Sequence, residues 1–200
     1  MKDLRIEKGK KTKENILLAS LEILFKEGRN GFSIRKLAQR AGVSSGNIYH
    51  HFKNMDEILE EAFKYDLKIS STLMKSFEFN DLESLIENFV VNIITIFKQK
   101  KENCQTSHDP FLELVSTNKN FLAILKNMES DMKTWFMGEL KKFLKKELPK
   151  EKEKYLTDIM SLYIEGARTN IFFIKKDTES YINTWRILSK HLVHTITEEV

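Results

Sequence analysis

Apolar residues recur every three or four positions along most of the chain, the spacing typical of helices that pack one face against a core. Over residues 12–27, for example, Ile16, Ala19 and Ile23 fall on one face, and Gly28 follows where a helix would end. We find no stretch with the apolar–polar alternation typical of a β-strand. The pattern therefore predicts an all-α fold.

The first quarter of the chain contains short helices joined by tight turns. Ser33 is suited to cap a second helix over residues 33–41. Gly42-Val43-Ser44 then forms a turn into a third helix over residues 45–52. This region is therefore predicted to be a compact three-helix unit.

Longer helical patterns follow, separated by capping signals. Asn54–Glu57 and Asn80–Glu83 resemble capping boxes, in which a side chain accepts a hydrogen bond from the first helical turn. Asp109-Pro110 supplies an N-cap and a first-turn proline for another helix. A long apolar pattern follows, and Pro149 ends it. Two more helices complete the chain, over residues 151–175 and 179–197.

Composition excludes several classes of protein. Seven Gly and two Pro in 200 residues are too few for an all-β chain, which needs turn residues every ~8–12 positions. Cys104 is the single cysteine, so an internal disulfide framework is excluded. There is neither an apolar run near the ~18 residues of a membrane span nor a signal peptide. We therefore expect a cytoplasmic protein with no membrane partner.

Charge is unevenly distributed. Residues 1–53 contain twelve Lys or Arg and five Asp or Glu, whereas the remainder contains 21 basic and 24 acidic residues. This asymmetry predicts two domains, 1–53 and 54–200, of which the first binds a polyanion such as nucleic acid. A solvated basic tail over residues 1–11 is the alternative explanation, and charge alone leaves both open.

The layout of Ser33–Phe52 is that of a helix-turn-helix, whose second helix enters the major groove while the first crosses the DNA backbone. Ser44 can cap that second helix, and Gly46 lets it approach DNA closely. Its outward side chains are short or planar hydrogen-bonding groups, suited to base edges and phosphates: Ser45, Asn47, Tyr49 and His50. An ordinary helical hairpin with a polar surface is the alternative at this point.

More specific motifs lie between Thr12 and Phe63. They include Gly31-Phe32-Ser33, Ala41-Gly42-Val43-Ser44 and His51-Phe52-Lys53-Asn54. With them, the segment closely resembles the N-terminal DNA-binding domain of TetR-family transcriptional regulators. The resemblance implies a helix-turn-helix domain followed by a larger helical ligand-binding and dimerisation domain. The rest of the chain is similar to that second domain only in length and helicity.

By this resemblance, nine residues are expected to bind DNA. They are Ser33, Arg35, Ser44, Ser45, Gly46, Asn47, Tyr49, His50 and Lys53. Of these, Ser45, Gly46 and Asn47 would face bases, Ser44 would cap the helix, and the others would contact the phosphate backbone. The family commonly has a Lys where this chain has Met55, so one phosphate contact is in doubt. The basic tail would either add backbone or minor-groove contacts or be a disordered solubilising segment.

The last two predicted helices are apolar on more than one face, so both faces must be covered. One would meet the body and the other a second subunit, in a two-fold four-helix interface that agrees with the family's mode of dimerisation. The predicted interface residues are Tyr155, Ile159, Leu162, Gly166, Thr169, Phe173, Tyr181, Trp185, Leu188 and Leu192. A compact monomer is the alternative.

A ligand pocket, if present, should lie among the middle helices. Its candidate residues are Phe89, Asn92, Phe97, His108, Phe111, Phe121, Met128, Met132, Trp135, Phe136 and Asn170. The same residues also fit an ordinary core. An apolar pocket suits a hydrophobic or amphipathic ligand. The family implies that such a ligand favours a conformation with low affinity for DNA.

We expect no catalytic residue, metal or cofactor. His191 and His194 share a helix face, but no carboxylate or cysteine completes a metal site. We find no Gly-rich phosphate loop and no serine nucleophile elbow. The sequence therefore predicts a homodimeric repressor that binds a palindromic site in double-stranded DNA and is released by a small ligand. An activator or a ligand-independent regulator stays open, and the alternative is a helical dimer that binds a small molecule or protein without specific DNA binding.

Overall fold

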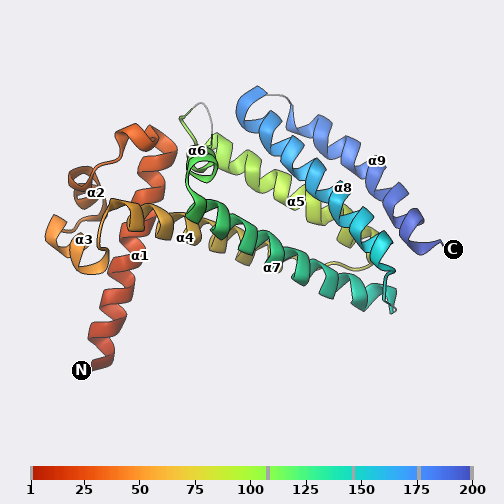
Figure 1. Cartoon of the computed structure of the whole chain (residues 1–200), viewed down its shortest axis with the longest axis horizontal. Helices are drawn as coiled ribbons and strands as arrows, with labels where there is room; N and C mark the ends of the chain where they lie inside the picture. The colour runs from red at the N-terminus through yellow and green to blue at the C-terminus, as the bar shows by residue number, and fades with distance from the viewer. Residues whose placement is uncertain (1, 107–108, 146, 175–176, 199–200) are drawn as a thin grey trace. The chain divides into compact units, whose positions relative to one another are not determined.

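The structure, a computed structural model, describes residues 2–106, 109–145, 147–174 and 177–198. Over these residues it contains helices and no strand, which confirms the all-α prediction (Figure 1). The chain forms two compact units. The N-terminal unit comprises Met1–Ile69 and Asn103–Leu125, and the C-terminal unit comprises Ser70–Glu102 and Lys126–Val200.

The N-terminal unit is built from short helices around one long one. Its elements are α1 (Lys2–Glu27), η1 (Arg29–Gly31), α2 (Ile34–Ala41), α3 (Ser45–His51), the first part of α4 (Met55–Lys75), α6 (Pro110–Thr117) and the start of α7 (Lys119–Leu144). Helix α1 begins much earlier than residue 12, where the apolar pattern predicts its start. The described basic residues before Thr12 are therefore helical, and the expectation of a disordered tail is wrong for them.

Local signals set the ends of α2 and α3. The backbone N–H of Lys36 donates to Ser33 Oγ (3.3 Å), and that of Asn47 donates to Ser44 Oγ (3.1 Å), so both serines cap as predicted. Gly42 ends α2 with φ +66°, a left-handed conformation that most side chains disfavour. Together these residues fix the turn between the two helices.

The C-terminal unit is a bundle of longer helices. Its elements are the end of α4, α5 (Leu82–Glu102), the remainder of α7, α8 (Lys150–Thr169), the π-helical turn η2 (Asn170–Ile174) and α9 (Thr178–Thr197). None of the helices in the described residues is long and apolar enough to span a membrane.

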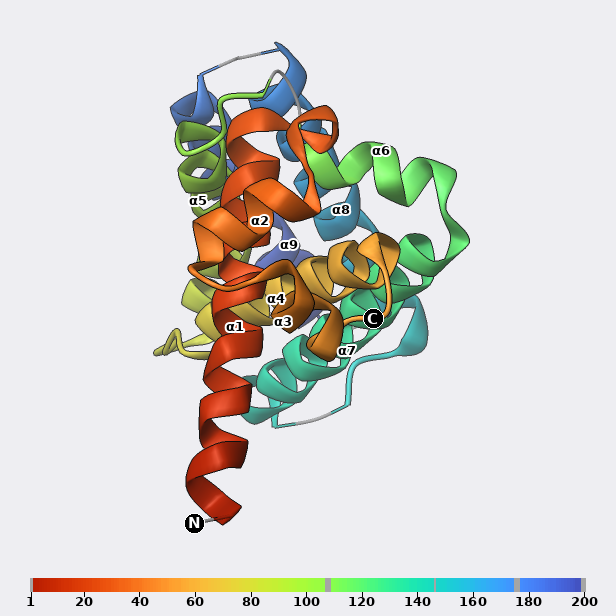
Figure 2. The ribbon, with the colours of Figure 1, turned by 90° about the vertical axis from the view of Figure 1, so that its left-hand side faces the viewer.

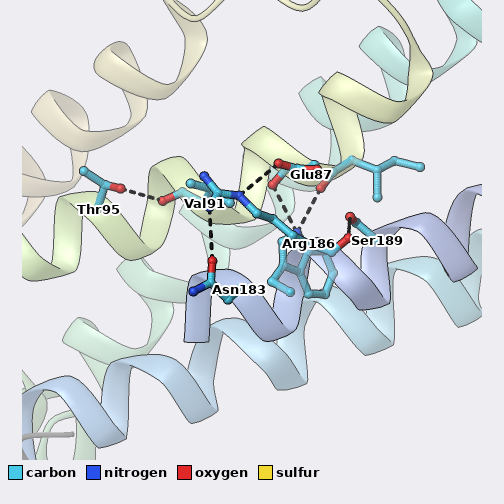
Figure 3. A network of polar contacts seen from close by, with 8 residues as sticks. Glu87, Val91, Thr95, Asn183, Arg186 and Ser189 are labelled. Carbon is cyan, nitrogen blue, oxygen red and sulfur yellow. Dashed lines mark hydrogen bonds and ion pairs between the residues drawn. The ribbon is translucent and has the colours of Figure 1, made fainter. Parts of the chain in front are cut away.

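Helix α9 is fixed to α5 by one buried aromatic residue. Trp185 is completely buried, and its indole N–H donates to the backbone carbonyls of Ile86 (3.3 Å) and Glu87 (3.1 Å). At the surface of the same contact, Arg186 pairs with the Glu87 carboxylate at 3.3 Å (Figure 3). A buried polar atom with partners costs little, so this contact stabilises the helix pair.

The two units do not follow the predicted boundary between residues 53 and 54. Ile58 and Leu59 of α4 are buried in the N-terminal core, so this helix starts in that unit. Phe111 of α6 belongs to the same core, which brings residues 103–125 back to the unit. The helix predicted after Asp109 is also interrupted, because α6 ends before Asn118 and α7 begins at Lys119.

Candidate nucleic-acid interface

Helices α2 and α3 pack against the N-terminal unit with one face each. Leu37 and Ala38 of α2 and Ile48 of α3 are buried, and Val43 in the turn between them is partly buried. Burial of these apolar residues holds the two helices at a fixed mutual orientation. Their opposite faces are left in solvent, and Figure 2 views the unit from the side on which they lie.

All nine predicted DNA-binding residues are exposed: Ser33, Arg35, Ser44, Ser45, Gly46, Asn47, Tyr49, His50 and Lys53. Tyr49 has the largest aromatic side chain among them, and 53% of its surface is accessible to solvent. An exposed row of hydrogen-bonding groups on a short helix matches the geometry of a recognition helix. Their binding to DNA stays a prediction.

Gly46 has no role in packing. A Cβ built on it would meet only Ser44 Oγ, at an ordinary contact distance of 3.8 Å. The unit would therefore accommodate a side chain here. What glycine provides is a low surface on the first turn of α3, which allows close approach of a large partner.

The basic side chains of the N-terminal unit form two groups, those with an ion-pair partner and those without one among the described residues. Lys26 and Arg40 both pair with Glu22, at 2.8 and 2.5 Å. By contrast, Arg35 on α2 and Lys53 after α3 form no ion pair with any described residue. These two cations can therefore bind phosphate oxygens without first breaking an ion pair inside the unit.

Below the exposed face, His51 packs beside the core. Partial burial lowers the pKa of His51, and the positive charges of His50 and Lys13 lower that pKa further. Its ring lies 5.4 Å from that of His50, measured between centroids. His51 therefore favours its neutral form and acts in packing, while His50 faces solvent.

Met55 does not take the place of the phosphate-binding lysine that the family commonly has. It is partly buried against the N-terminal core. The start of α4 is nevertheless well capped, because the N–H of Glu57 donates to Asn54 Oδ1 (2.9 Å) and the N–H of Lys53 donates to Glu57 Oε2 (2.6 Å). This box holds the backbone of Lys53 and leaves its side chain in solvent.

The predicted pocket residues are divided between the two units. Phe111 and Phe121 pack on Phe63 in the N-terminal core, with ring centroids 4.8 and 5.4 Å away. These two residues are core of a different unit from the others, which corrects the prediction of one shared set. His108 lies outside the described residues.

The remaining candidates belong to the C-terminal unit. Phe89 is central, with its ring 4.7 Å from Phe136 and 6.1 Å from Trp135. Phe89, Met132 and Phe136 are buried. The partly buried candidates are Asn92, Phe97, Met128, Trp135 and Asn170. A cavity of about 370 Å³ does lie on the surface, but its lining residues are Glu27, Lys36, Gln39 and Arg40 of the N-terminal unit.

The residues of the predicted dimer interface differ in exposure. Trp185 and Leu192 are fully buried inside the C-terminal unit, so the prediction that they face a partner is wrong. The partly buried members are Ile159, Tyr181 and Leu188, and the exposed ones are Tyr155, Leu162, Gly166, Thr169 and Phe173. Sequence reasoning missed two apolar residues that the structure exposes, Ile174 and Ile187. Helices that are apolar all round give no signal from which to tell these faces apart.

Comparisons with known proteins match the N-terminal unit most strongly. Residues 16–62 fit the family described as bacterial regulatory proteins, tetR family. An uncharacterized HTH-type transcriptional regulator of Haemophilus influenzae is 41% identical over 66 residues, which cover 32% of this chain and 35% of that protein. The matched part thus spans about a third of that relative. The HTH-type transcriptional regulator PksA of Bacillus subtilis is 27% identical over 187 residues, with 83% and 85% covered.

Solved structures extend the likeness of fold to almost the whole chain. A TetR transcription regulator from Haloarcula marismortui has a TM-score of 0.72 at 18% identity, covering 94% of this chain and 98% of that one. The regulator FadR from Bacillus subtilis, solved in complex with stearoyl-CoA, has a TM-score of 0.54 at 18% identity, covering 88% and 96%. The helix-turn-helix segment therefore matches the tetR family of bacterial regulatory proteins, and the solved structures show a similar fold over almost the whole chain.

Proposed function

We propose that this protein is a cytoplasmic, non-enzymatic transcriptional regulator that binds a two-fold symmetric DNA site as a homodimer. The observation that carries the proposal is the free face of α3, which lies within the segment that matches the TetR family. Ser45, Gly46 and Asn47 form its exposed first turn, where side chains would reach base edges.

Phosphate contacts would lie on both sides of the first turn of α3. Arg35 lies on α2 and Lys53 follows α3 in the chain, and both are exposed cations without an ion pair among the described residues. Tyr49 and His50 add hydrogen-bonding groups on the same helix. Backbone contacts on both sides of a recognition helix fix its register in the groove, while the base contacts supply sequence preference.

The exposed apolar residues of α8 and α9 support the homodimer. Leu162 is 72% exposed and Ile187 is 65% exposed, values that leave large aliphatic side chains in water. A second copy of the chain would cover both on an isologous interface. Two recognition helices related by a two-fold axis would then bind half-sites separated by about one turn of DNA, roughly 34 Å.

We further propose that the regulator is a repressor, released by a hydrophobic or amphipathic ligand bound in the C-terminal unit. The aromatic cluster of Phe89, Trp135 and Phe136, with Asn92 partly buried on α5, supplies apolar contacts and a polar anchor. The FadR structure, similar in fold, holds stearoyl-CoA. This acyl thioester is therefore a rational first probe, read out by quenching of tryptophan fluorescence and by loss of DNA binding.

Selection from random duplex DNA tests the central proposal. Purified protein is incubated with the pool at two salt concentrations, and bound DNA is sequenced. Enrichment of a two-fold symmetric site is the expected result. Salt-sensitive binding without an enriched site, or no binding after removal of co-purified ligand by unfolding and refolding, would contradict it. The second of these outcomes would favour a dimer that binds a small molecule or protein instead.

A further inference from the structure

The first turns of α1 carry a group of basic residues that lies outside the helix-turn-helix. Helix α1 begins at Lys2, well before residue 16, where the match to the family begins. We name residues 4–11 the α1 extension. All of its side chains except Gly9, which has none, are exposed. Because the extension continues α1 without a break, it is a helical projection of the N-terminal unit rather than a loose tail.

The cations of the α1 extension have no carboxylate partner among the described residues. They are Arg5, Lys8, Lys10 and Lys11. Glu7 is the acidic residue of the extension, and no ion pair joins it to any of them. Four cations close together on one helix repel each other, and Glu7 is the single acidic residue of the extension that offsets this repulsion. Their charge is therefore available to an external anion.

This contrasts with the rest of the N-terminal unit, where most basic side chains are neutralised. Lys13, for example, pairs with Glu61 at 3.2 Å, and Lys36 pairs with Glu27. Outside the extension, the described cations of the unit without an ion pair are Arg35, Lys53, Lys68 and Lys119. The α1 extension, with four unpaired cations in eight residues, is thus the densest group of unpaired positive charge in the described N-terminal unit, and the helix-turn-helix contributes Arg35 and Lys53.

The α1 extension and the helix-turn-helix lie on the same side of the unit. Figure 1 shows the N-terminal turns of α1 leaning toward the side occupied by α3. In Figure 2, which faces that side, the same turns project beyond α2 and α3. At a rise of about 1.5 Å per residue the extension is roughly 11 Å long. That length matches about three successive phosphates of one strand, which are spaced ~3.4 Å apart along the axis of duplex DNA.

We propose that the α1 extension binds the phosphate backbone of duplex DNA just outside the half-site contacted by α3. This inference rests on the proposed function of the chain as a DNA-binding regulator. The contact adds affinity and lengthens the protected site, and it carries no preference for bases, because phosphates present the same oxygens in every sequence. The partner is duplex DNA because the cations of the extension and those of the helix-turn-helix would then bind one and the same polyanion.

The test compares two duplexes, both built around the site selected by the wild-type protein. One carries ten base pairs on each side of the site, and the other is trimmed to the site itself. Wild-type protein should bind the long duplex at least tenfold more tightly at low salt. The variant Lys8→Gln/Lys10→Gln/Lys11→Gln, which leaves Arg5 as the one cation of the extension, should lose most of this preference. Its log–log salt slope on the long duplex should be shallower by about 2.7 per subunit, since each lost contact removes ~0.9.

A matched control is available in the same unit. Lys68→Gln/Lys119→Gln removes two exposed and unpaired cations on α4 and α7. This variant should keep the wild-type preference for the long duplex. Equal behaviour of the triple variant and the wild type would overturn the inference while leaving the regulator proposal intact. Failure of the wild type to bind any selected site would instead remove the proposed function itself.

Gly9 tests whether the extension acts as a helix. A Cβ at this position would meet no atom within 4 Å, so Gly9→Ala keeps the helix and every charge. Gly9→Pro also keeps every charge but removes a backbone donor and clashes with the preceding turn. The alanine variant should retain the preference for the long duplex, and the proline variant should lose it. If the proline variant binds like the wild type, helical docking of the extension is wrong.

Discussion

The two units of this protein leave different chemistry in solvent. On its helix-turn-helix the N-terminal unit exposes polar groups and unpaired cations, with Asn47 and Lys53 among them, and elsewhere it leaves apolar residues such as Leu4 in solvent. The C-terminal unit pairs many of its surface charges, as Arg186 does with Glu87, and exposes large apolar residues such as Leu162. A polar, basic surface suits a polyanion, and an apolar one suits a protein. Each unit is therefore equipped for a different partner.

The largest expected effect is on the free energy of unfolding, and it appears when one aromatic residue of each unit is replaced in turn by alanine. Trp185→Ala removes a fully buried side chain and its two hydrogen bonds to α5, so it should lower the free energy of unfolding by about 3–5 kcal/mol. Tyr49→Ala removes an exposed ring and should change that free energy by less than ~0.5 kcal/mol. Urea unfolding followed by circular dichroism measures both. Similar losses in the two variants would contradict the division into a buried and an exposed aromatic.

The next prediction concerns dimerisation through the exposed apolar residues of the C-terminal unit. Leu162→Asp places a charge in the proposed dimer interface and leaves the fold unchanged, because Leu162 is 72% exposed. The variant should sediment as a monomer and bind the selected site about a hundredfold more weakly, since the two half-sites are no longer bound together. Leu73→Asp, an exposed position on α4, is the control and should remain a dimer. A dimeric Leu162→Asp variant would refute this interface.

Within the N-terminal unit, base contacts should separate from phosphate contacts. Asn47→Ala should cost about 1–3 kcal/mol on the preferred site and alter the order of affinities among single-base variants of that site. Lys53→Ala should weaken binding to all of these variants alike and reduce the salt slope by ~0.9 per subunit. Competition binding against a panel of mutated sites distinguishes them. An unchanged order of affinities for the Asn47 variant shows that this residue does not contact bases.

The smallest effect concerns pH. The pKa of His51 is lowered in the folded protein, so below the ordinary value of 6.5 the unfolded chain binds more protons than the folded one. Stability should therefore fall as pH decreases from about 7 through 6.5 and on toward the lower folded pKa. The change should be under ~1 kcal/mol and absent in His51→Gln, measured by thermal unfolding between pH 5.5 and 7.5. A variant with the wild-type pH profile would assign the effect to another group.

The predictions from sequence succeeded where the signal was local. Ser33 and Ser44 cap the helices that follow them because a cap needs only its own next three residues. Local signals did not predict the burial of Trp185 and Leu192. Their helix is apolar on several faces, so its sequence does not state which face meets α5.

The domain boundary failed for a related reason. A change in charge near residue 53 marks a change in surface, but α4 continues through it with Ile58 and Leu59 in the N-terminal core. Phe111 returns to the same core from far along the chain. Contacts between residues so distant in sequence leave no periodic trace from which to predict them.

The sequence by itself determined the helical class, the helix-turn-helix and the outward side chains of α3, because each depends on short-range spacing and capping. Tertiary structure alone decided which apolar faces of α8 and α9 remain in solvent and which aromatic residues belong to which core. It also decided that the described basic residues before Thr12 continue α1 as a helix. Those outcomes depend on packing between distant segments, where burial of one face releases another to solvent.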